Sequence, residues 1–140
     1  MKKYLNLSLI YALAALICGV FYREFTKWNG YATVTTLGKV HVHLFVMGMM
    51  IVFLIVALFS MHLELKKYKT FRTFLWIYNI GLPITAVMMV IRGITQVLNI
   101  SLSSVANAAI SGIAGIGHIL TGVGIILLLV SLKKAAENGR

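Results

Sequence analysis

Residues 108–132 read AAISGIAGIGHILTGVGIILLLVSL, an apolar stretch whose one ionisable side chain is His118. A helix needs roughly 20 apolar residues to cross the hydrocarbon core of a bilayer, and this stretch is long enough. An ionisable side chain in that core costs free energy, so it calls for a specific role. The stretch therefore predicts a membrane-spanning helix with a histidine well inside it.

Three more apolar stretches of similar length precede it, at about residues 5–22, 38–63 and 74–98. Of the 140 residues, 60% are hydrophobic and only 11% are charged, whereas charged residues make up about 25% of a typical soluble domain. The connecting segments are short, so neighbouring helices should run antiparallel. The sequence predicts one all-α integral membrane domain over residues 1–140, a bundle of four transmembrane helices with up-down topology.

The basic residues predict how this bundle is oriented. The net charge is +10, but the Lys and Arg residues flank the apolar stretches, which argues against a nucleic-acid partner and for the lipid bilayer. Nine basic residues fall on the side of the two termini, against three on the other side. The nine are Lys2, Lys3, Lys66, Lys67, Lys69, Arg72, Lys133, Lys134 and Arg140. We therefore expect a multi-pass protein of the cytoplasmic (cell) membrane with both termini in the cytoplasm.

The second stretch contains three of the four histidines. His41 and His43 lie near its start, and residues two apart on a helix point to nearly opposite sides. His43 shares its face with Met47 and a continuing apolar seam, so we expect it to face the bundle interior, with His41 at the outer membrane interface. Gly48 shares the face of His41 and would admit a close neighbour there, which keeps the opposite assignment open. His62, at the other end, reads as an interfacial residue.

His118 shares its helix face with Ser111, Gly115 and Gly122, whose small side chains would let a flat macrocycle approach closely. Two inward histidines on different helices could each give one axial nitrogen to the iron of haem b. We therefore predict His43 and His118 as metal ligands. Counted from the basic residues at the cytoplasmic ends, the two histidines differ in depth by roughly 12 Å, which opposes this pairing.

Four more residues are candidates for contact with the cofactor: Arg92, Gly48, Gly115 and Met47. Arg92 follows Arg72 by 20 residues, roughly 30 Å along a helix, and so lies near the outer edge. It either extends to the lipid headgroups or pairs with a haem propionate. Methionines such as Met47 are common as flexible core filling, and glycines in membrane helices as packing contacts, so a structural role stays open for these residues.

Several segments together resemble one family of small bacterial membrane proteins that carries only a domain-of-unknown-function label. They are Gly19-Val20-Phe21-Tyr22-Arg23-Glu24-Phe25-Thr26-Lys27, Leu37-Gly38 through His41-Val42-His43, Met47-Gly48-Met49, Arg92-Gly93-Ile94 and Ile110-Ser111-Gly112-Ile113-Ala114-Gly115-Ile116-Gly117-His118. The likeness extends over essentially the whole chain. It implies a four-helix membrane protein and no particular activity.

A shorter pattern, His41-Val42-His43 followed by Gly48, resembles the haem-copper oxidases and the related nitric-oxide-response membrane proteins. In that group a histidine early in a helix holds a haem iron. The resemblance implies His43 or His41 as one axial ligand. The chain departs from the oxidases because it has far fewer helices and lacks the histidines of their copper site, so oxygen reduction is not implied.

These observations predict a haem b protein for electron transfer or for sensing a gas or redox state, with a redox partner or a second copy as possible partners. The first alternative is a non-enzymatic accessory or structural subunit whose histidines make hydrogen bonds between helices. The second is a small transporter or channel in which Arg92, His118 and the helix break at Pro83 line a polar path. No acidic residue lies in a predicted span, which argues against membrane hydrolases and carboxylate-based ion relays, so the sequence gives no sign of an enzyme.

Overall fold

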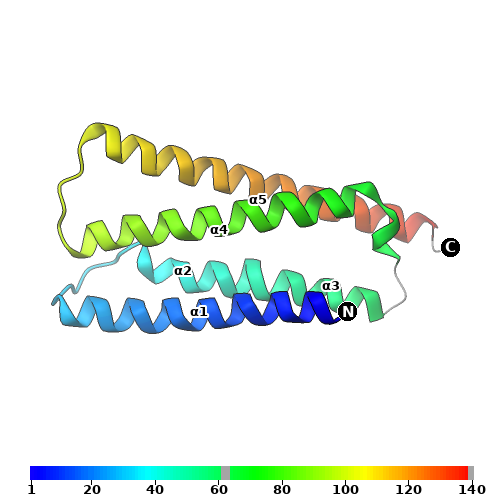
Figure 1. The fold of residues 1–140 in the computed structure, drawn as a ribbon, viewed down its shortest axis with the longest axis horizontal. Coiled ribbons are helices and arrows are strands. Elements are labelled where there is room, and N and C mark those ends of the chain that lie inside the picture. Colours follow the sequence, from blue (N-terminus) through cyan, green and yellow to red (C-terminus); the bar gives the residue numbers. More distant parts are fainter. Residues whose placement is uncertain (61–63, 139–140) are drawn as a thin grey trace.

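The computed structural model of the protein describes residues 1–60 and 64–138 and consists of helices joined by short segments. The helical elements are α1 (Lys2–Trp28), α2 (Leu37–His43), η1 (Leu44–Met50), α3 (Ile51–Ser60), η2 (Leu65–Lys67), α4 (Lys69–Val97) and α5 (Ser104–Asn138). Here η1 is a π-helical segment and η2 a single 3₁₀ turn. Because α2, η1 and α3 follow one another without a break, they form one rod, and the described chain makes four rods side by side (Figure 1).

All four rods are long and apolar enough to cross a membrane, which confirms the predicted all-α membrane bundle. The described part of the chain contains no strand. The two termini lie toward the same end of the bundle, as an even number of up-down helices requires (Figure 1). The helices run past most predicted ends, to Trp28 in α1 and Asn138 in α5, because a helix can continue beyond the apolar segment into the polar interface. His62 lies outside the described residues.

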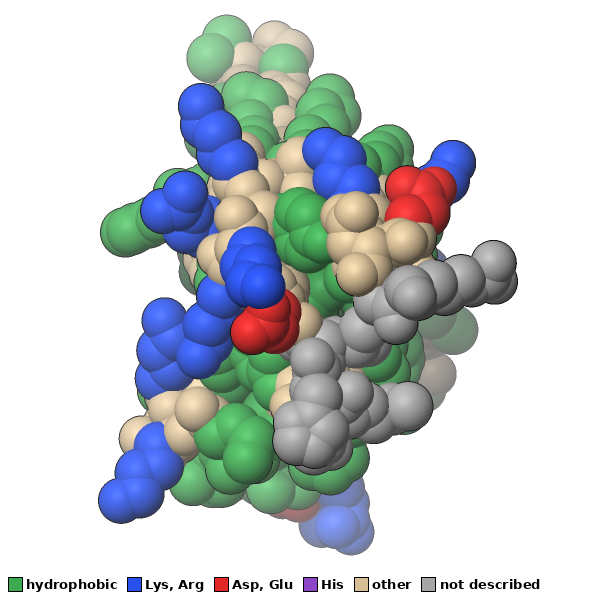
Figure 2. Space-filling model, turned by 90° about the vertical axis from the view of Figure 1, so that its right-hand side faces the viewer, with side chains coloured by type: hydrophobic (Ala, Val, Ile, Leu, Met, Phe, Trp, Pro, Cys, Tyr) green, Lys and Arg blue, Asp and Glu red, His purple; other side chains and the backbone are tan. Residues whose placement is uncertain are grey.

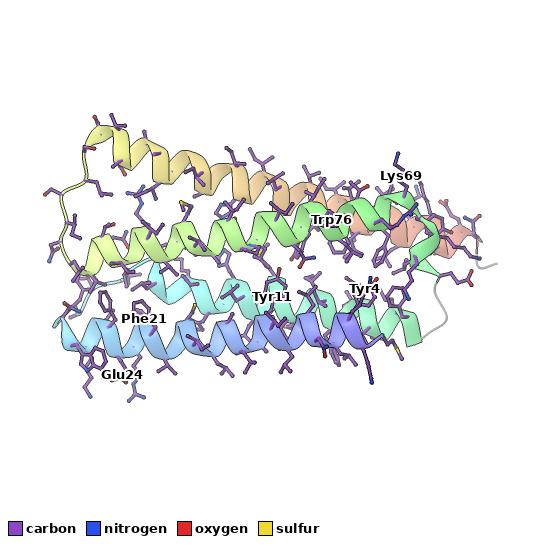
Figure 3. The ribbon with its side chains drawn as sticks, viewed as in Figure 1. Tyr4, Tyr11, Phe21, Glu24, Lys69 and Trp76 are labelled. Atoms are coloured by element: carbon purple, nitrogen blue, oxygen red, sulfur yellow. The ribbon has the colours of Figure 1, made fainter. Side chains whose placement is uncertain are left out.

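An aromatic cluster fills the core at the end near the termini. Phe71, Phe74 and Tyr78 of α4 are fully buried, and Tyr4 of α1 packs against Phe71 with ring centres 6.5 Å apart. Figure 3 shows Tyr4 and Tyr11 on the side of α1 that faces the other helices. This cluster joins α1, α3 and α4 into one packed unit, since Phe59 of α3 contacts both Tyr4 and Phe71.

Polar side chains at mid-membrane depth are used to tie helices together. The Tyr11 hydroxyl donates to Asn79 Oδ1 at 2.8 Å, and the Tyr78 hydroxyl donates to the Met47 carbonyl at 2.6 Å. Asn79 Nδ2 donates to the Leu75 carbonyl of its own helix. Although Pro83 deprives Asn79 of one backbone hydrogen bond, α4 continues as a helix through it. Tyr78 and Asn79 thus bind protein groups, whereas the Thr85 hydroxyl is buried without a hydrogen-bond partner. Because the Thr85 side chain is closed off from solvent, this arrangement gives no support to a polar channel.

Helix α5 packs mainly on α4, and glycines set the distance between them. A Cβ atom on Gly81 would lie 2.7 Å from the Thr121 backbone nitrogen, and one on Gly117 would lie 2.9 Å from the Thr85 backbone nitrogen. Gly124 fits against the Tyr78 ring in the same way. This glycine contact is the close approach typical of small residues in membrane helices. It fixes the height of α5, and with it the height of His118.

Candidate functional site

The structure brings His43 and His118 together. His43 ends α2 and His118 lies in the first half of α5, yet their ring centres are 6.3 Å apart and the ring planes are nearly perpendicular, at 87°. The predicted depth difference of roughly 12 Å is therefore wrong. It was counted from Lys66, which lies beyond the end of α3 in the η2 turn and so adds little along the helix axis. Ser60 is 17 residues after His43 and Lys134 is 16 after His118, which are nearly equal lengths of helix.

The two imidazoles are held in the same way. His43 Nδ1 is 2.9 Å from the Lys39 carbonyl oxygen, and His118 Nδ1 is 2.8 Å from the Ala114 carbonyl oxygen. Because a carbonyl oxygen only accepts hydrogen bonds, each Nδ1 carries the proton. Each Nε2 then has a free lone pair, which is the state a neutral imidazole needs in order to ligate a metal. In both residues the hydrogen bond fixes the tautomer and the ring orientation together.

A π-helical segment begins directly after His43. The seven residues Leu44–Met50 are wound more widely than an α-helix, which changes the angular phase between His43 and the rest of the rod. Such segments inside helices are frequent at functional sites. The sequence gives no sign of it, because the stretch is apolar on every side.

The space beside His118 is not filled by protein. Gly115 and Gly122 share the His118 face of α5 and Gly112 lies about 120° around the helix from it, and a Cβ atom on any of the three would meet nothing within 4 Å. His118 itself is exposed and His43 only half-buried, although the two rings lie close together, edge to face. These three glycines differ from Gly117, which packs on α4. The glycines of α5 thus fall into two sets, one that packs on α4 and one whose Cβ positions have no protein neighbour.

Arg92 lies toward the end of the bundle away from the termini. Its guanidinium donates to the Asn107 side chain, to the Asn107 carbonyl at 3.3 Å and to Ser111 Oγ at 2.7 Å. Ser111 is two turns before His118 on the same face, about 10 Å along the axis. Among the described residues no carboxylate forms a salt bridge with Arg92. A pocket of about 440 Å³ beside it is lined by polar groups including Tyr31, Gln96 and Asn107.

Three of the other predicted site residues lie elsewhere. His41 packs against α1, where its ring is 3.7 Å from the position of a Cβ on Gly19, and its Nδ1 is buried without a hydrogen-bond partner. The structure thus places it between helices rather than beside the histidine pair. Gly48 faces α1 as well, because the Tyr11 ring occupies the space of its missing Cβ. Met47 is tied to α4 by its carbonyl, so it is placed by packing.

Gln96 was not predicted as a site residue, and it organises the start of α2. Its Oε1 accepts hydrogen bonds from the Thr36 backbone nitrogen at 2.8 Å and from the Thr35 and Thr36 hydroxyls at 3.0 Å. Gly93, one turn earlier, lies against the Leu37 backbone with no room for a Cβ. These contacts anchor the start of α2 on α4 and so fix the position of His43 along the bundle. A lone glutamine near the end of an apolar stretch is too weak a signal to reveal this.

The donor set at the histidine pair consists of two imidazoles. The described residues contain no group of three or more His, Cys, Asp or Glu that could hold a metal ion. A bare zinc ion typically takes three or four protein ligands, whereas haem supplies four nitrogens and takes one or two from the protein. A metal–imidazole bond is about 2 Å and the ring centre lies about 1 Å behind the nitrogen, so two imidazoles sharing one metal have centres roughly 6 Å apart. The histidine pair has this spacing.

Comparisons with known proteins place the whole chain in one family. No curated protein matches it, and no solved structure matches it. The local resemblance to the haem-copper oxidases has no counterpart in these findings and stays a prediction. The family model described as "Protein of unknown function (DUF2871)" matches residues 1–135, nearly the entire chain, and the protein belongs to this family.

Proposed function

We propose that the protein binds haem b in the gap between α2 and α5, with His43 and His118 as the two axial ligands. The observation that carries the proposal is the pair itself, with ring centres 6.3 Å apart and both Nδ1 atoms hydrogen-bonded to carbonyl oxygens. The open side of Gly112, Gly115 and Gly122 offers room for a flat ring. Bound haem would supply one-electron chemistry, either for electron transfer or for sensing a gas or redox state.

Arg92 is the proposed partner of the haem propionates. Its positive charge lies about 10 Å from the level of His118, at the outer end of the same helix face, and no described carboxylate neutralises it. A carboxylate that reached the guanidinium would replace the neutral acceptors of Asn107 and Ser111 by a charge-assisted hydrogen bond. In this arrangement the propionates point to the outer surface and the apolar edge of the ring to the bilayer centre.

The test is the absorption spectrum of the full-length protein, purified in detergent from haem-replete cells. We expect a red protein with a Soret band and, after reduction, the sharp visible bands of six-coordinate haem. A pyridine haemochrome measurement should identify the porphyrin as type b and give one haem per chain. A colourless protein that takes up no added haemin would contradict the proposal and favour the accessory-subunit role.

We also propose that both termini are in the cytoplasm. The end of the bundle that holds the termini is rich in Lys and Arg side chains (Figure 2), and such residues are enriched in cytoplasmic segments. A green fluorescent protein fused after Arg140 should therefore fluoresce, and alkaline phosphatase inserted after Trp28 should be active. As controls, exchanging the two reporters should silence both. Active phosphatase at Arg140 would reverse the orientation.

A further inference from the structure

A groove between the starts of α1 and α4 lies on a different side of the bundle from the histidine pair. Its cavity measures about 530 Å³ and is lined along α1 by Lys3, Asn6, Leu7 and Ile10. Leu75, Trp76 and Asn79 line it along α4. Residues 3, 6, 7 and 10 share one face of a helix, as do 75, 76 and 79. The groove therefore runs along the surface between one face of α1 and one face of α4, and it is open along its length.

The groove is graded from charged to apolar. Lys3 and Asn6 lie at the mouth near the termini and are exposed, and Leu7, Ile10 and Leu75 continue toward the bilayer centre. Arg72, one turn before Trp76, is exposed on the same face of α4. Trp76 has 74% of its surface exposed, and tryptophan favours the level of the lipid headgroups. Asn79, at the far end, already bonds Tyr11 and Leu75, so the groove ends without a free polar anchor.

The mouth of the groove carries positive charge that the protein does not neutralise. The chain has three acidic residues, and each forms its salt bridge elsewhere: Glu24 with Arg23, Glu64 with Lys67 and Glu137 with Lys133. No described carboxylate pairs with Lys3 or Arg72. Lys3 Nζ lies 4.9 Å over the Tyr4 ring, which directs it to this side of α1. The two cations are Lys3 and Arg72. Their position above an apolar groove suits a lipid with an anionic headgroup and apolar acyl chains.

We propose that this groove is a binding site for one anionic phospholipid from the leaflet that faces the termini. The phosphate lies between Lys3 and Arg72, and an acyl chain lies along Leu7, Ile10 and Leu75. Basic pockets between membrane helices are a common form of anionic-lipid site. The lipid covers the apolar seam between α1 and α4 and leaves the histidine pair untouched, so the site is independent of haem binding.

Trp76 provides the test, because the chain has only one other tryptophan, Trp28. The variant Trp28→Phe is placed in phosphatidylcholine nanodiscs that contain a small, equal fraction of lipid with brominated acyl chains. Brominated phosphatidylglycerol should quench Trp76 fluorescence at least about twofold more than brominated phosphatidylcholine. Equal quenching by the two lipids would overturn the proposal.

A matched pair of charge variants shows whether the site is local. In the Trp28→Phe background, Lys3→Gln with Arg72→Gln should bring phosphatidylglycerol quenching down to the phosphatidylcholine value. Lys133→Gln with Lys134→Gln removes the same charge from the same end of the bundle and should leave the difference unchanged. If both pairs of substitutions lowered the quenching difference equally, the attraction of phosphatidylglycerol would depend only on the overall positive charge of this end of the bundle. That result would overturn the proposed site. If the first pair does not fold, Lys3→Gln and Arg72→Gln should each lower the quenching difference alone.

Discussion

Replacing His118 or His43 by alanine should abolish the six-coordinate haem spectrum. Each variant removes one of two imidazoles whose centres are 6.3 Å apart, and among the described residues no third histidine is positioned to replace it. The Soret band should weaken and shift to the position of five-coordinate or free haem, and the sharp bands of the reduced protein should disappear. Absorption spectra of the purified variants, at matched protein concentration, provide the measurement.

His41→Ala is the matched control, because His41 lies two residues from His43 but packs against α1 at Gly19. It should keep the full low-spin spectrum. A wild-type spectrum for His43→Ala together with a loss for His41→Ala would exchange the roles of the two residues.

Added imidazole should restore the spectrum of His118→Gly, since it can occupy the space of the missing ring. Gly115→Leu should also prevent haem binding, although it leaves both ligands in place, because its side chain would fill the gap.

A large loss of stability is expected for Gly81→Ala. The added Cβ would lie 2.7 Å from the Thr121 nitrogen and 2.9 Å from the Gly117 carbonyl oxygen, and backbone atoms of a helix cannot turn aside. Helices α4 and α5 must then separate, and overpacking of this kind costs about 1–3 kcal/mol. Unfolding in SDS, followed by circular dichroism, should show this decrease in the free energy of unfolding.

Gly112→Ala is the control for that prediction, since it adds the same methyl group to α5 where nothing lies within 4 Å. It should leave stability unchanged or raise it by up to about 1 kcal/mol, because alanine favours the helix over glycine. Equal stabilities for the two variants would mean that α4 and α5 are not held at the distance that the structure shows. Gly81→Ala should weaken haem binding as well, because α5 carries His118.

The four transmembrane helices were predictable from hydropathy, since twenty apolar residues in a row have few alternatives in a protein. The site was predictable only in part. The sequence drew attention to His43 and His118 because a histidine inside an apolar span is conspicuous, and the structure places their rings close together. The faces of the helices could not be read in the same way, because a helix that is apolar all round gives no periodic signal. This is why Gly48, which packs on Tyr11, and Gly115, which borders open space, looked alike in the sequence.

Depth along the membrane was the second quantity that the sequence could not supply. It depends on where each helix ends and how tightly it is wound, and both differ within the second rod. The π-helical segment Leu44–Met50 and the end of α3 at Ser60 bring His43 to the level of His118, and neither has a residue signature. The contacts of Gln96 with Thr35 and Thr36 were equally hidden, because they join segments 60 residues apart.

The attachment of α5 to a single main neighbour has a consequence for biogenesis. The aromatic cluster joins α1, α3 and α4, whereas α5 is synthesised last, packs mainly on α4 through glycines and adds only Leu128 and Ala135 to the buried core. One histidine of the pair is thus in position before the other arrives. A planar molecule dissolved in the bilayer can reach the first histidine while the fourth rod is still undocked, and the docking of that rod then completes the enclosure. With haem bound as proposed, loading of the site would be coupled to the docking of α5.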